Sequence, residues 1–106
     1  MPKYLLVYHG AAGPMPSSQE EIDKVMAAWS AWFGSLGDAV VDGGNPVGKS
    51  RTVHPGGKVT NDGGPDPATG YSILSAGSDA EVAEMAKGCP HLADGGTIEI
   101  APIMEM

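Results

Sequence analysis

Sixteen glycines and nine prolines are distributed very unevenly along this chain of 106 residues. Twelve of these 25 residues fall between positions 43 and 70, which makes that stretch rich in turn-forming sequence. The flanking sequence is much poorer in them, so ordinary helices and strands are expected there. A chain of this length has room for one core, and we therefore expect a single domain over residues 1–106 with one long inserted loop.

Apolar periodicity predicts a strand and a long helix before the loop. The apolar and aromatic run from Lys3 to His9 is typical of a buried strand. Ser18 and Glu21 have the spacing of a capping box, which marks a helix start, and Gly37 suits a helix end. Between them one apolar stripe recurs in steps of three and four, formed by Ile22, Val25, Met26, Trp29, Trp32, Phe33 and Leu36. A brief strand is expected within residues 38–42.

The remaining elements follow from the same signals. Residues 50–54 and 58–60 flank a Pro-Gly-Gly turn and predict a small hairpin, whereas residues 61–70 are almost all turn-forming. Residues 71–76 are expected to form a strand, and Ser78 with Glu81 begins a second helix that ends near Gly88. Residues 97–103 alternate as a strand with two differently solvated faces.

This order of elements is that of an α+β fold, a ferredoxin-like βαββαβ sandwich with an inserted hairpin. The helices would cover one face of the sheet and leave the other bare. A protein this small does not leave an apolar sheet face in water, so we expect a homodimer that packs two sheets face to face. The long loop is expected to be a mobile flap over the resulting cavity.

Charge and composition exclude several classes of function. Six basic residues stand against thirteen acidic ones, and no two basic residues are adjacent, which argues against nucleic acid as a partner. The apolar run near the N-terminus is too short for a membrane span or a signal peptide, so we expect a cytoplasmic protein with no membrane contact. The scattered histidines and the single cysteine lack the spacing of metal ligands. Residues 43–50 lack the spacing of a P-loop. No cofactor is expected.

Several short segments carry a resemblance to a known family. They are the opening Lys3-Tyr4-Leu5-Leu6-Val7-Tyr8, the loop sequence Asp62-Gly63-Gly64-Pro65, and Cys89-Pro90-His91-Leu92 followed by the strand from Gly95 to Ile103. Together and in this order they resemble the YCII-related proteins, in particular the DGPF-domain subgroup, across essentially the whole chain. The resemblance implies a dimeric α+β barrel, a fold that elsewhere hosts cofactor-independent lyases, isomerases and monooxygenases.

The chain departs from that family pattern at two places. The Asp-Gly-Pro-Phe of the subgroup is here Asp-Gly-Gly-Pro, with an extra glycine and no phenylalanine. The His and Asp proposed as an active pair in the YCII branch would fall near Met26 and Cys89, and neither is the required residue. That pair is therefore not carried over to this chain.

The histidines are the first candidates for acid–base work near neutral pH. His9 ends the first strand on the same face as Leu5 and Val7, where it either lines the barrel mouth or only bonds the loop. His91 is a candidate ligand-binding residue, although capping of helix carbonyls from a loop is the favoured interpretation. His54 is expected to be a solvated turn residue. Tyr71, which begins the strand after the loop, is a further candidate ligand-binding residue.

Two carboxylates join the candidate catalytic set. Asp62 either projects over the cavity or simply accepts backbone hydrogen bonds in a turn. Glu99 alternates with Ile98 and Ile100, so it points into the dimer cavity if those isoleucines contact the helices. Otherwise it points into solvent. Cys89 falls on an apolar helical phase and is expected to be inert.

Two functions from different classes remain open at this stage. The first is a cofactor-independent small-molecule lyase or isomerase that moves a proton in the dimer cavity, with His9, Glu99 and Asp62 as catalytic residues. The second is a non-catalytic protein, accessory or regulatory in role, that binds a small ligand through His9, His91 and Tyr71.

Overall fold

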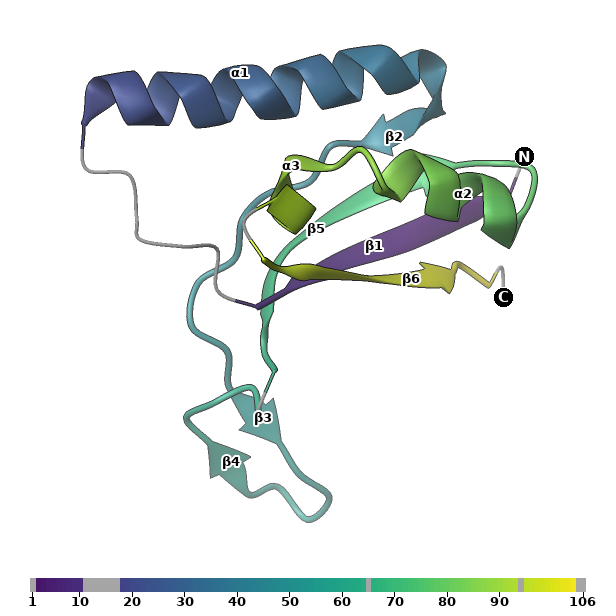
Figure 1. Cartoon of the computed structure of the whole chain (residues 1–106). Coiled ribbons are helices and arrows are strands. Elements are labelled where there is room, and N and C mark those ends of the chain that lie inside the picture. Colours follow the sequence, from purple (N-terminus) through teal and green to yellow (C-terminus); the bar gives the residue numbers. More distant parts are fainter. Residues whose placement is uncertain (1, 11–17, 65, 94, 105–106) are drawn as a thin grey trace.

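The computed structural model describes residues 2–10, 18–64, 66–93 and 95–104. Its main sheet has four strands, β1 (Lys3–His9), β2 (Val40–Asp42), β5 (Ala68–Ser75) and β6 (Thr97–Pro102), in the order β2-β5-β1-β6 (Figure 1). Every neighbouring pair in this sheet is antiparallel. The predicted mixed α+β class is confirmed.

Three α-helices lie within the described residues: α1 (Gln19–Leu36), α2 (Asp79–Ala86) and α3 (Pro90–Ala93). Ser18 caps α1 by accepting a hydrogen bond from the backbone N–H of Glu21, and Gly37 ends it with a positive φ of 57°. Ser78 caps α2 through the N–H of Glu81 in the same way. Both helix starts predicted from the capping-box spacing are therefore confirmed.

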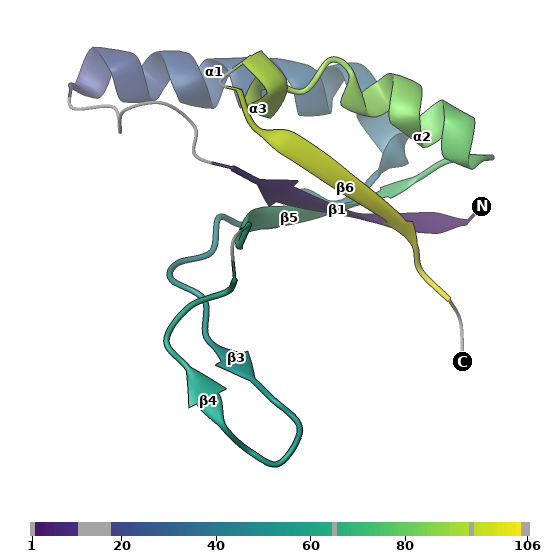
Figure 2. The same ribbon diagram turned by 60° about the horizontal axis from the view of Figure 1, so that its bottom comes forward.

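All three helices pack on one face of the sheet (Figure 2). Alternation along β1 buries Tyr4, Leu6 and Tyr8 beneath them, and Leu74 of β5 lies in the same core. The opposite face carries the half-buried Leu5, Val7, His9, Tyr71, Ile73 and Ala101, which no helix covers. The two faces therefore differ sharply in what they contact within the chain.

The core covers only part of the apolar stripe of α1. Trp32 is buried and donates its indole N–H to the carbonyl oxygen of Met85, at 3.0 Å. Nearer the start of the helix, Ile22, Val25 and Met26 are exposed, Met26 by 62%. Core contacts thus hold the second half of α1, while the first half presents apolar side chains beyond the core.

The second strand lies within the expected residues, at Val40–Asp42, after a 3-10 helix over Gly37–Ala39. Three other local predictions need correction. Strand β5 begins at Ala68 because the register with β1 extends into the glycine-rich loop, which removes residues 68–70 from the predicted turn. The second helix ends at Ala86. Pro90–Ala93 form a separate short helix, where a loop was expected.

The inserted hairpin is present but short, with β3 (Thr52–Val53) paired to β4 (Val59–Thr60) as a separate two-stranded sheet. It extends away from the main sheet on the side opposite the helices (Figure 2). Gly56 and Gly57 form its turn with φ of 91° and 94°, a conformation that favours glycine. Along the described ranges, none of the helices combines the length and the apolar character that crossing a membrane requires.

Candidate functional site

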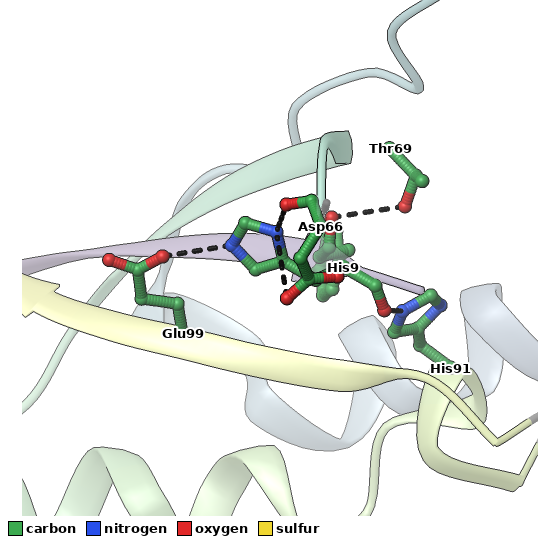
Figure 3. Close-up of polar contacts among 6 residues, drawn as sticks. His9, Asp66, Thr69, His91 and Glu99 are labelled. Atoms are coloured by element: carbon green, nitrogen blue, oxygen red, sulfur yellow. Dashed lines mark hydrogen bonds and ion pairs between the residues drawn. The ribbon is translucent and has the colours of Figure 1, made fainter. Parts of the chain in front are cut away.

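His9 and Glu99, 90 positions apart in sequence, meet on the helix-free face of the sheet (Figure 3). Nε2 of His9 lies 2.8 Å from Oε1 of Glu99. β6 runs beside β1, with Glu99 paired to Val7 and Thr97 paired to His9. The neighbouring residues Ile98 and Ile100 pack against the core, which leaves Glu99 on the helix-free face. Alternation left the direction of Glu99 open, and the packing of the two isoleucines decides it in favour of the face that carries His9.

A β-bulge sets the position of His9. The register of β1 and β5 shifts between Tyr8 and His9: Tyr8 pairs with Gly70, but His9 pairs with Ala68. Thr69 is the additional residue, and its hydroxyl donates to the carbonyl oxygen of Tyr8 at 3.0 Å. Bulges bend a strand and redirect a side chain, which is why they are common beside functional sites.

Asp66 completes the surroundings of the His9 ring. Nδ1 of His9 donates to the carbonyl oxygen of Asp66 at 2.9 Å, and a carboxylate oxygen of Asp66 lies 3.8 Å from the same nitrogen (Figure 3). Both nitrogens of the ring are therefore engaged. The His9 side chain is 15% exposed, whereas Glu99 is 63% exposed, so the carboxylate faces solvent over a nearly enclosed imidazole.

The partners of His9 determine where its protons lie. A carbonyl oxygen can only accept, so Nδ1 must carry a proton. The contact with Glu99 then contains one more proton, held either by Nε2 as an imidazolium or by the carboxyl group. The hydrogen bond to Glu99 raises the pKa of His9 above its ordinary value, more than partial burial lowers it, and Asp66 acts in the same direction as Glu99. The imidazolium–carboxylate form is thereby favoured.

His91 supports the end of β1 from the other side of the sheet. It is buried in α3, its Nε2 donates to the carbonyl oxygen of His9 at 2.8 Å, and its ring lies 5.3 Å from that of Tyr8. Gly96 makes room for it, since a Cβ there would stand 2.1 Å from Nε2. The prediction that His91 caps helix carbonyls is wrong, because the carbonyl it binds belongs to a strand.

The other sequence candidates lie apart from this pair. Asp62 accepts a hydrogen bond from the N–H of Gly64 at 3.2 Å, the turn geometry considered as its alternative role. Tyr71 lies on the neighbouring strand β5, where it pairs with Val7 of β1. His54 sits exposed in the hairpin, with Nε2 3.2 Å from the hydroxyl of Thr60. Burial raises the pKa of Cys89 to about 11, against a lowering contact with the backbone of His91, so its thiol is protonated near neutral pH.

Sequence reasoning missed the role of Asp66. It selected Asp62, four positions earlier, because Asp62 belongs to the family loop motif. The Asp66 contact uses a backbone carbonyl, which any residue type possesses, so residue identity gave no signal for it. Metal ligands do not gather here either: within residues 2–10, 18–64, 66–93 and 95–104, no three His, Cys, Asp or Glu side chains form a group that could hold an ion.

Comparison with known families confirms the YCII-related part of the resemblance noted in the sequence. The model of the YCII-related domain matches residues 6–106, and the chain therefore belongs to the YCII-related family. Among curated proteins, none matches the chain. Because a shared fold does not fix the chemistry, the function has to be derived from the site itself.

Proposed function

We propose that this protein is a cofactor-independent lyase or isomerase that moves a proton on a small enolisable substrate. The observation that carries the proposal is the His9–Glu99 contact of 2.8 Å, on the sheet face left open by the helices. A paired acid and base in one site is what proton transfer between carbon and oxygen requires. In this assignment the exposed carboxylate of Glu99 accepts the proton, and the His9 imidazolium donates to the developing oxyanion.

The proposed setting is a homodimer with a ferredoxin-like protomer, forming an α+β barrel. The strand order β2-β5-β1-β6 supports this topology, with α1 between β1 and β2 and with α2 and α3 between β5 and β6. Leu5, Val7 and Ile73 are half-buried beside the catalytic pair and would be covered by a second sheet. Packing of the two faces would enclose His9 and Glu99, which would strengthen their electrostatic interaction with a substrate. We further propose that the chain belongs to the DGPF subgroup, because its loop from Asp62 to Pro65 resembles the motif of that subgroup.

A second candidate function is a non-catalytic ligand-binding protein with an accessory or regulatory role. The observation that favours it is that both ring nitrogens of His9 already have partners inside the chain. Such a histidine can orient Glu99 without exchanging a proton itself. In that case the exposed carboxylate would only accept hydrogen bonds from a ligand.

Deuterium incorporation from heavy water separates the two functions. A panel of small ketones, keto acids and hydroxy acids is incubated with the protein, and exchange at the carbon next to the carbonyl is followed by proton NMR. For a substrate that exchanges, His9→Asn and Glu99→Gln should each slow incorporation about 100-fold, the usual scale for general acid–base catalysis. Cys89→Ala serves as the control and should leave the rate unchanged.

A different result would reject the catalytic function. If a panel member binds but the unmodified protein does not speed its exchange above the rate in buffer alone, the protein only binds this ligand. His9→Asn and Glu99→Gln should then weaken affinity by only about 1 kcal/mol each, the net contribution of a typical hydrogen bond.

A further inference from the structure

We propose that the helix-covered side of the molecule holds a second site, which binds a neutral, planar aromatic molecule. The site is a cavity of about 500 Å³ between α1, the end of β1 and the start of β5. This volume is in the range of pockets that bind small organic ligands. The cavity lies across the sheet from Glu99 and uses neither of the carboxylates assigned above, so the inference is independent of the proposed function.

Aromatic side chains form one wall of this cavity. The ring of Trp29 lies 5.3 Å from that of Tyr8 at an interplanar angle of 83°, and 5.9 Å from that of Phe33. These rings present flat apolar surfaces on which an aromatic ligand can pack. Val25 and Met26, the exposed apolar residues in the first half of α1, also line the cavity. Their exposure is accounted for if a ligand covers them.

The opposite wall is backbone held rigidly against β5. The N–H of Tyr71 donates to the carbonyl oxygen of Asn45 at 3.2 Å, and the N–H of Val47 donates to that of Thr69 at 3.0 Å. Gly44 has a φ of 73°, and a Cβ there would stand 1.7 Å from the carbonyl oxygen of Tyr71. Only glycine allows this approach. The wall therefore exists before a ligand arrives, which lowers the entropy cost of binding.

The polar groups of the cavity select a neutral ligand. Among its described lining residues there is no Asp, Glu, Lys or Arg. The hydroxyl of Tyr8 is 2.7 Å from that of Ser72, which in turn donates to the carbonyl oxygen of Gly43, and burial raises the pKa of Tyr8 to about 12. Nε2 of His91 is committed to β1. A charged ligand would find no counter-charge here and would lose its hydration.

A matched pair of probes and a matched pair of variants test the proposal. N-phenylnaphthylamine is neutral and fluoresces in apolar sites, and anilinonaphthalene sulfonate is its anionic counterpart. Ser30 is exposed and lines the cavity, whereas its neighbour Ala31 is exposed and does not. Ser30→Phe fills the cavity and should weaken binding of the neutral probe about tenfold or more, which corresponds to about 1.4 kcal/mol. Ala31→Phe should leave its affinity within about twofold.

Binding of one neutral probe per chain, with the sulfonate bound about tenfold more weakly, is the expected result for the unmodified protein. The proposal is overturned if the neutral probe shows no saturable binding, if the sulfonate binds as tightly, or if Ser30→Phe has no effect. It is also overturned if Ser30→Phe lowers the sedimentation mass, since the cavity would then be an interface between copies. Glu99→Gln should leave probe binding unchanged, so a failure of the proposed reaction can be told apart from a failure of this second site.

Discussion

The two faces of the main sheet are built from the same strands but differ in how far their side chains are buried within the chain. On the helix-covered face, β1 contributes Tyr4, Leu6 and Tyr8, all buried within the chain. On the other face the same strand contributes Leu5 and Val7, which are only half-buried, and His9 with its partner Glu99. Alternation along one strand thus separates the residues that fold the protomer from those available to a substrate or a second copy.

The largest expected effect compares two adjacent leucines across these faces. Leu6 is fully buried, so Leu6→Ala should lower the free energy of unfolding by about 2–5 kcal/mol, from lost burial and the cavity left behind. Leu5→Ala on the open face should cost less. The loss of unfolding free energy in Leu5→Ala should also vary with protein concentration, because the stability of the proposed dimer depends on that concentration. Urea unfolding at two protein concentrations provides the measurement.

Equal costs for the two leucine variants, both independent of concentration, would contradict this distinction. Such a result would mean that the open face is covered in some other way. It would also remove the main reason for proposing a face-to-face dimer.

The next prediction concerns the dimer directly. Sedimentation equilibrium at micromolar concentration should give about twice the chain mass for the unmodified protein. Ile73→Lys places a charge at the centre of the open face and should shift the species to a monomer, because an unpaired charge is costly to bury. Val53→Lys, at an exposed position of the hairpin, is the control. A monomeric unmodified protein would refute the barrel, and dimers that survive Ile73→Lys would place the interface elsewhere.

Local signals in the sequence were enough to predict most of the elements. The Ser18 and Ser78 caps and the glycine end of α1 are short-range features, so their helices start and stop close to the predicted positions. Alternation placed Glu99 opposite Ile98 and Ile100, but it did not decide which of the two sides faces the helices. The contact of Glu99 with His9 needed one further fact, namely that β6 pairs with β1 in a register that brings the two residues together.

Other features depend on contacts that short-range patterns do not encode. The bulge at Thr69 and the Asp66 carbonyl arise from the path by which the loop rejoins β5. The short α3 helix follows α2 after three residues, where Gly88 and Pro90 predict a loop. The cavity beside Trp29 lies where the first half of α1 extends beyond the core. Periodicity identifies the apolar stripe but does not indicate how much of it the core covers.

The smallest expected effect is the contribution of the His9–Glu99 contact to the free energy of unfolding. The folded-state pKa of His9 is raised above the ordinary value of about 6.5, so the folded protein holds this proton more tightly than the unfolded chain. The stabilisation is therefore fully present below about pH 6.5 and is lost as the pH rises through the folded-state pKa. Because Glu99 is largely exposed, solvent and salt screen the interaction and the effect should be small.

Glu99→Gln removes the carboxylate that raises the pKa of His9, and its effect on unfolding should itself depend on pH. Unfolding in urea at about pH 5.5 and about pH 8.5 should show the variant less stable than the unmodified protein at the lower pH, with the two converging at the higher. Glu84→Gln is the control, because Glu84 is an exposed carboxylate that pairs with Lys87 and not with a histidine. If the difference in free energy of unfolding between Glu99→Gln and the unmodified protein stayed constant with pH, the His9–Glu99 contact would not couple proton binding to folding. The helix-free face would then differ from the covered face in packing alone. Glu99 would have to act on a ligand without an electrostatic contribution from His9.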